Sequence, residues 1–227
     1  MAKTAEKKEK ALVIVESPAK SKTIKKILGD SYQIEASFGH VRNLPTKDPS
    51  TENLGFDISN HFTPKFEVIP GKQAVVKKLN ELAKKADKIY LASDPDREGE
   101  AIAWHVRQIL NVPDDKIMRI VFNEITPKAV KHSVENPRAI DMDMVQAQQT
   151  RQILDKLVGY KLSPVLWKQI GNRNLSAGRV QSVALRMICE REEEIEAFVP
   201  QEYWSIHADM EKDGKIFEAE LSKIKDK

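Results

Sequence analysis

Short apolar runs and amphipathic stretches alternate along the first 140 residues. Continuous apolar runs of this length predict buried strands, and the stretches between them predict helices. Residues 72–86 give the clearest helix, because their apolar side chains recur on one stripe. Strands are predicted at 11–15, 32–37, 88–92 and 117–122. Strands that alternate with helices indicate an α/β fold with a parallel sheet, in which ligands bind beyond the carboxyl ends of the strands.

Cap and turn residues mark the ends of these elements. Ser17-Pro18 predicts the start of a helix and Gly29 its end, and Thr126-Pro127 predicts another start. Residues 46–71, rich in Pro, Asn, Asp and Gly, are expected to form a long loop or insertion. Residues 1–10 are dominated by Lys and Glu and are expected to form a flexible basic tail.

The second half of the chain has a different pattern. From residue 141 to about 198 there is no strand signal, only helical periodicity with expected breaks at Gly159, Ser163-Pro164 and 171–174. Ser176 is a candidate cap for a helix over 177–197, which would place Arg179 in its first turn. From Tyr203 onward, alternation around Asp213-Gly214 predicts a β-hairpin. An α/β part, a helical segment and the start of a β region therefore follow one another.

Composition narrows the class of protein. The 227 residues are 41% hydrophobic and 31% charged, as in an ordinary soluble globular protein, which excludes a disordered chain. The net charge of +3 permits a polyanionic partner without requiring one. Cys189 is the only cysteine, which excludes an internal disulfide and a thiolate metal cage. The sequence contains neither a membrane-spanning stretch nor a signal-peptide core, so we expect a cytoplasmic protein without membrane contact.

The run Asp94-Pro95-Asp96-Arg97-Glu98-Gly99-Glu100 contains the strongest chemical signal. Four carboxylates stand within seven residues, directly after a predicted strand. Charges of one sign at this density are tolerated when they are fully solvated, as at a helix start, or when a cation lies among them. Mg²⁺ fits the oxygen ligands. An EF-hand calcium loop is disfavoured, because His105 stands at loop position 12 and a strand leads into the loop.

Other charged residues fall near the same predicted sheet edge. Glu16 follows the first strand as Asp94 follows a later one, so their side chains should meet. One or two carboxylates suffice for Mg²⁺, which leaves a glutamate for proton transfer. Lys20, in the first turn of the next helix, is a candidate phosphate contact, although an exposed surface lysine is the alternative. Arg179 follows Ser176-Ala177-Gly178 and has the same two interpretations.

Four segments match the bacterial type IA DNA topoisomerases in the same order: 13–20, 37–40, 94–100 and 175–182. The chain resembles the N-terminal part of these enzymes from about residue 11 to 200. The resemblance implies a TOPRIM domain over 11–140, with a Rossmann-like parallel sheet flanked by helices. It also implies a helical DNA-binding segment over 141–200 and the first strands of a truncated β domain over 201–227.

The resemblance also implies an activity and site residues. The family relaxes negatively supercoiled DNA without ATP, by Mg²⁺-dependent cleavage of one strand, passage and religation. By position, Glu16 would handle the proton of the leaving 3′-oxygen and would also lie among the metal ligands. The other metal ligands would be Asp94, Asp96 and Glu98. Residues expected to contact DNA are Lys20, His40, Arg97, Arg179 and Gln181, of which Lys20 and Arg179 would also be catalytic. A lone histidine after a strand is usually structural, which is the alternative role for His40.

One departure from the family pattern concerns the nucleophile. The family uses a tyrosine in a Tyr-x-Arg-Thr motif, and none of Tyr32, Tyr90, Tyr160 and Tyr203 has that context. We therefore expect a chain without the nucleophile, which binds Mg²⁺ and single-stranded DNA but does not complete the reaction. We also expect a monomer, associated with the nucleoid, with further topoisomerase domains downstream.

Two alternatives are a stand-alone TOPRIM nuclease or primase-like protein and a non-catalytic nucleic-acid-binding module. Residues 175–182 argue against the nuclease, because that motif belongs to topoisomerases.

Overall fold

The computed structural model describes residues 10–45 and 54–224. Nearly all of the predicted basic tail therefore lies outside the described residues, as do residues 46–53 of the predicted loop. The chain forms two compact units, one up to Arg179 and the other from Val180. Domain boundaries at residues 140 and 200 stay predictions.

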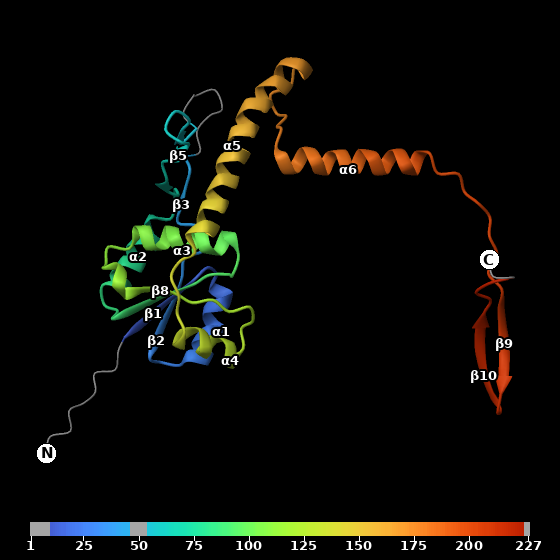
Figure 1. Ribbon diagram of the computed structural model, residues 1–227, viewed down its shortest axis with the longest axis horizontal. Helices are drawn as coiled ribbons and strands as arrows, with labels where there is room; N and C mark the ends of the chain where they lie inside the picture. The colour runs from blue at the N-terminus through green and yellow to red at the C-terminus, as the bar shows by residue number, and fades with distance from the viewer. Residues whose placement is uncertain (1–9, 46–53, 225–227) are drawn as a thin grey trace. The chain divides into compact units, whose positions relative to one another are not determined.

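The first unit is built around a parallel sheet of four strands (Figure 1). Its strands are β1 (Ala11–Val15), β2 (Tyr32–Ala36), β7 (Lys88–Ala92) and β8 (Ile117–Arg119). Their order is β2-β1-β7-β8, which confirms the predicted parallel α/β fold. Val15 lies opposite both Ala36 and Ala92, so three strands end at one common edge.

Helices cover both faces of this sheet (Figure 1). Helices α1 (Pro18–Leu28) and α4 (Pro127–Glu135) cover one face, whereas α2 (Gln73–Ala83) and α3 (Arg97–Ile109) cover the other. The buried strand β1 contributes to the core on both faces of the sheet, because its alternate side chains point to opposite faces. Leu12 and Ile14 pack with α2 and α3. Val13 and Val15 pack with α1 and α4. Each such burial contributes about 1.5–3 kcal/mol.

Several predicted boundaries needed correction. Helix α2 ends at Ala83, before the predicted end at residue 86. Strand β8 ends at Arg119, before the predicted end at residue 122, although Ile120 N still donates to Leu91 O at 3.0 Å. Strand β2 ends at Ala36. Two short antiparallel pairs involve the described part of the predicted loop, although one of the four strands lies before it. They are β3 (Arg42–Asn43) with β6 (Glu67–Val68), and β4 (Phe56–Asp57) with β5 (Thr63–Pro64).

The predicted breaks at Gly159 and Ser163-Pro164 are wrong. Helix α5 runs without interruption over 29 residues, Met142–Ile170, and ends, as predicted, at the left-handed Gly171. The chain that returns after the helix contacts it at Gly159 and Ser163. A Cβ at Gly159 would lie 3.4 Å from the carbonyl oxygen of Ala177, and the buried Ser163 Oγ accepts a hydrogen bond of 3.1 Å from Ala177 N. Tertiary contacts thus outweigh local propensity.

The second unit contains the remaining predicted elements. Helix α6 (Arg179–Glu196) begins two residues later than expected, with Arg179 as its first residue. Strands β9 (His207–Lys212) and β10 (Lys215–Glu220) form the predicted antiparallel hairpin. Its turn uses Asp213 and Gly214, both with positive φ, which explains the Asp-Gly signal. Within the described part of the chain, no helix has the length and hydropathy to cross a membrane.

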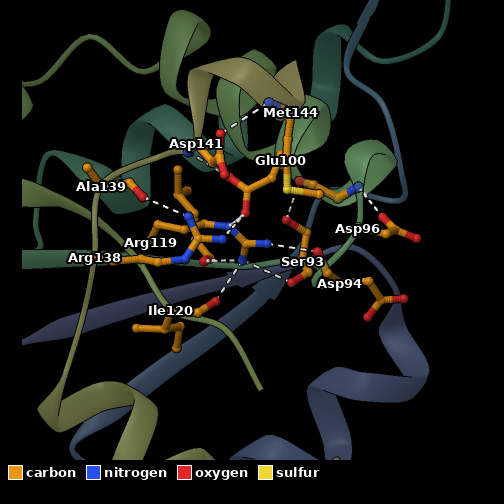
Figure 2. A network of polar contacts seen from close by, with 12 residues as sticks. Ser93, Asp94, Asp96, Glu100, Arg119, Ile120, Arg138, Ala139, Asp141 and Met144 are labelled. Atoms are coloured by element: carbon orange, nitrogen blue, oxygen red, sulfur yellow. Dashed lines mark hydrogen bonds and ion pairs between the residues drawn. The ribbon is translucent and has the colours of Figure 1, made fainter. Parts of the chain in front are cut away.

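A buried ion pair lies at the carboxyl edge of the sheet (Figure 2). The side chains of Arg119, on β8, and Glu100, in the first turn of α3, are both fully buried, and Arg119 Nε donates to Glu100 Oε1 at 3.0 Å. The rest of the guanidinium donates to backbone carbonyls over 2.7–3.0 Å: Leu91, Ser93, Asp94 and Ile120. Burial lowers the pKa of Arg119, and the Glu100 carboxylate opposes that shift.

Glu100 also holds the chain that leads into α5. Its carboxylate accepts from Arg138 Nη2, and its second oxygen accepts from Asp141 N at 3.1 Å. Arg119 and Arg138 pair through their backbones as well (2.8 and 2.9 Å). Asp141 then caps α5 by accepting from Met144 N. One carboxylate thus ties α3, β8 and the start of α5 together.

Next to this edge, His105 of α3 is buried in an aromatic cluster. Its ring lies 4.6 Å from Phe66, 4.8 Å from Trp104 and 5.6 Å from His40, centroid to centroid. Its Nδ1 is buried and has no hydrogen-bond partner among the described residues. Burial, followed by the charges of His40 and Arg42, lowers the pKa of His105 to about 3.

Replacing Glu100 with Gln should cost about 3–5 kcal/mol of unfolding free energy, because two arginines lose their counter-charge and one of them is fully buried. Urea unfolding measures this loss. Asp114→Asn is the matched control, because it breaks an exposed ion pair with Arg107 and should cost much less. Equal losses in the two variants would contradict the assigned importance of the buried pair.

Acidification should destabilise the protein through His105. Between pH 6.5 and about 3 the unfolded histidine binds a proton that the folded one does not. The free energy of unfolding therefore falls as the pH falls through this window, with a contribution that approaches about 1.4 kcal/mol per pH unit. Unfolding curves of wild type and His105→Phe across this range isolate that contribution. His132→Gln, on an exposed position of α4, should keep the wild-type slope.

Candidate metal and phosphate site

The acidic loop between β7 and α3 is shaped by its own hydrogen bonds. Asp96 caps α3, since its Oδ1 accepts from Gly99 N at 2.7 Å, and Ser93 Oγ donates to Gly99 O at 2.6 Å. A Cβ at Gly99 would lie 2.1 Å from the carbonyl oxygen of Asp94, so no other residue fits there without moving the backbone. The loop that carries the carboxylates is therefore tightly closed.

Glu16 and Asp94 converge on one cation, the ammonium group of Lys20. Lys20 Nζ donates to Glu16 Oε1 at 2.7 Å and to Asp94 Oδ1. Burial would lower the pKa of Lys20, but the hydrogen bonds and charges of Asp94 and Glu16 raise it on balance. The meeting of these side chains at the sheet edge, expected from the strand ends alone, is thus present in the structure.

Glu98 has different partners. Its Oε1 lies 2.5 Å from His40 Nε2, and its Oε2 accepts from Gln148 Nε2 of α5 at 3.2 Å. The turn that carries His40 is fixed to the first strand, because Gly39 N donates to Glu16 O at 2.9 Å. Phe38 and Gly39 have φ values of 58° and 80°. Glycine adopts positive φ without steric cost, which explains why it stands at position 39. His40 therefore belongs to the acidic site, next to Glu98.

The other predicted DNA contacts are Arg97, Arg179 and Gln181. Arg97 is exposed at the first position of α3. Arg179 Nη1 lies 3.1 Å from Asp155 Oδ1 of α5, with both side chains about two-fifths exposed. Gln181 belongs to α6 in the second unit. The roles of Arg97, Arg179 and Gln181 in DNA binding stay predictions.

A pocket of about 430 Å³ opens beside the cluster. It is lined by Lys20, Asp94, Pro95, Asp96 and residues 122–125. Asn123 and Glu124 follow strand β8 at the same edge, a position that could have identified them from the sequence. A larger cavity, about 680 Å³, lies at the opposite ends of β1 and β2, between the first residues of these strands, and contains none of the predicted site residues.

The donor set fits a divalent cation only in part. Glu16 and Asp94 already share one cation, Lys20, and Asp96 lines the same pocket with one carboxylate oxygen outside its cap bond. Glu98 faces His40 and Gln148 instead. Within the described ranges, no group of three or more His, Cys, Asp or Glu side chains is arranged to hold a metal ion. Metal binding at this edge therefore requires side-chain rotation.

Two residues with clear structural roles were missed or misjudged from the sequence. The acidic run predicts that Glu100 needs solvent or a metal ion, but its counter-ions are Arg119 and Arg138. No role is predicted for Arg119 from the sequence. A charged residue within the apolar run 117–122 was the available signal, because a buried arginine requires a partner.

Comparison with known proteins supports the resemblance. Residues 11–125 match the Toprim domain family, and residues 139–227 match the DNA topoisomerase family. Toprim domains typically bind a divalent metal ion. Among solved structures, the chain is similar to full-length topoisomerase I from Thermotoga maritima, with 49% sequence identity and a TM-score of 0.72.

That similarity covers 93% of this chain and 35% of the Thermotoga protein, so the chain spans about a third of the length of this relative. The Toprim match alone covers the sheet and the acidic loop, and the topoisomerase match covers α5, α6 and the hairpin. From its Toprim domain and the topoisomerase sequence that follows it, the chain belongs to the bacterial type IA DNA topoisomerases.

Proposed function

We propose that this chain supplies the metal and phosphate site of a topoisomerase that relaxes negatively supercoiled DNA. The reaction would be Mg²⁺-dependent cleavage of one strand, passage and religation, without ATP. One observation carries the proposal beyond family membership. Glu16 and Asp94, from the ends of neighbouring strands, converge on one cation beside a pocket that Asp96 also lines.

The proposed metal ligands are Asp94 and Asp96, with Glu98 close by and Glu16 from the neighbouring strand. When bound, Mg²⁺ would neutralise charge on phosphate oxygens, and substrate would complete its coordination. We assign proton transfer to the leaving 3′-oxygen to Glu16, whose partly buried side chain (23% exposed) lies at the same sheet edge. The cations proposed for the phosphates are Lys20 and Arg179.

The nucleophile of the proposed reaction is a tyrosine. We assign it to none of the four tyrosines of this chain, because none stands in the family motif. Tyr90 is a buried strand residue of β7, and Tyr160 lies inside α5. The proposed partners are single-stranded DNA and further topoisomerase domains, and the proposed location is the nucleoid in the cytoplasm.

Removing charge from the acidic loop should abolish Mg²⁺ binding. Asp94→Asn with Asp96→Asn keeps the shape of both side chains, and asparagine still caps α3, so the fold should survive. Isothermal titration of the chain with MgCl₂ should show weak binding in wild type and none in the double variant. The control Asp30→Asn removes an exposed carboxylate beyond the end of α1 and should leave the affinity unchanged. Equal affinity in all three proteins would exclude this metal site.

Single-stranded DNA should be held mainly through its phosphates. Arg179→Ala should weaken binding similarly for all sequences and make the slope of log K against log salt shallower by about 0.7. Fluorescence anisotropy with several labelled oligonucleotides at graded salt measures both quantities. Arg191→Ala, at the far end of α6, is the control for loss of a positive charge. An effect confined to particular sequences would indicate base recognition by Arg179 instead.

A further inference from the structure

Lys20 is the cation that currently balances the two carboxylates of the candidate site. Its ammonium group bonds Glu16 and Asp94 together, and its side chain is only 21% exposed. These acceptors come from different strands, and Asp94 lies 74 residues from Lys20 in the sequence. The contact therefore depends on the fold as well as on helical spacing.

This arrangement has an electrostatic consequence. Two carboxylates and one ammonium leave a net charge of −1 at a partly buried edge, which still attracts a cation. Mg²⁺ carries twice the charge of the ammonium and binds carboxylate oxygens at about 2.0–2.1 Å. A metal ion on these oxygens would lie a few ångströms from the ammonium group, and two cations at that distance repel strongly where water is partly excluded. Metal and Lys20 therefore compete for the same oxygens.

We propose that Lys20 is an exchangeable counter-ion: Mg²⁺ displaces its ammonium group from Glu16 and Asp94, and the released group binds a phosphodiester of the DNA. This inference rests on the proposed function, whose metal and DNA it uses. It adds an order of events, in which the same lysine holds the metal-free site together and becomes available for phosphate only after the metal binds.

The released ammonium has an anion-binding environment within reach. Lys20 lies in the first turn of α1, whose Ser17 cap makes no side-chain hydrogen bond to the helix. The backbone N–H groups of this turn lack intrahelical acceptors and favour an anion. Lys20 also lines the 430 Å³ pocket together with Asp94 and Asp96, so phosphate in that pocket would meet both metal and ammonium. Binding of metal and of DNA would then be coupled reciprocally.

Magnesium titration of the whole chain tests the competition directly. Lys20→Gln removes the competitor and should bind Mg²⁺ about tenfold more tightly than wild type, whereas Lys20→Arg should stay close to wild type. Lys26→Gln removes a charge from an exposed position of the same helix and should also leave the affinity unchanged. Unchanged or weaker binding in Lys20→Gln would overturn the exchange.

Thermal unfolding gives a second readout if Lys20→Gln folds poorly. Two carboxylates without their ammonium should lower the melting temperature of the metal-free variant. Mg²⁺ should then raise it more than it raises that of wild type, because the variant gains a cation where wild type only exchanges one. A smaller rise in the variant than in wild type would count against the exchange.

DNA binding tests the second half of the proposal. At constant ionic strength, Mg²⁺ should tighten binding of labelled oligothymidylate by wild type severalfold, and this gain should vanish in Lys20→Gln. The same gain in both proteins would refute the transfer of Lys20 to phosphate. The proposed function fails separately: if Mg²⁺ binds wild type and the Asp94→Asn, Asp96→Asn variant equally, the metal site itself is wrong, whatever Lys20 does.

Discussion

A guanidinium group without solvent contact must find all its hydrogen-bond partners inside the protein, and Arg119 does so where the acidic loop begins. Its donors reach Glu100 and four carbonyl oxygens, three of them at the end of β7 and in the following loop. Any shift of that loop would leave buried donors of this guanidinium without acceptors, at a cost of about 1–3 kcal/mol each. This constraint fixes the backbone from which Asp94 projects.

The same ion pair also fixes the position of residues outside the sheet. Through Glu100 it holds Arg138 and the amide of Asp141, and Asp141 caps α5. Helix α5 in turn contributes Gln148 to Glu98 and Asp155 to Arg179. The acidic loop and the long helix are therefore positioned by one shared buried group, although they lie in separate segments of the sequence. Such sharing would keep the proposed metal-binding and DNA-binding groups in a fixed relation to each other.

The sequence predicted the sheet and the meeting of Glu16, Lys20 and Asp94, because both follow from local rules. Apolar runs mark buried strands, and parallel strands end at a common edge. Contacts between distant segments could not be predicted in this way. Nothing local indicates that Glu98 faces His40 and Gln148, or that Glu100 is neutralised by arginines 19 and 38 residues away. Local rules likewise do not show that α5 continues through Gly159 and Pro164, or that residue 177 returns to contact it at Gly159 and Ser163.

The pairing of β1 with β7 has a consequence for how the protein acquires its site during folding. Strand β1 can pair with β2 after a short helical crossover, but its other neighbour is synthesised much later. Closing such a long loop is entropically costly, and non-local parallel pairing forms slowly. Glu16 and Asp94 come together only when that step is complete. The proposed site with both Glu16 and Asp94 would therefore be complete only after β1 has paired with β7.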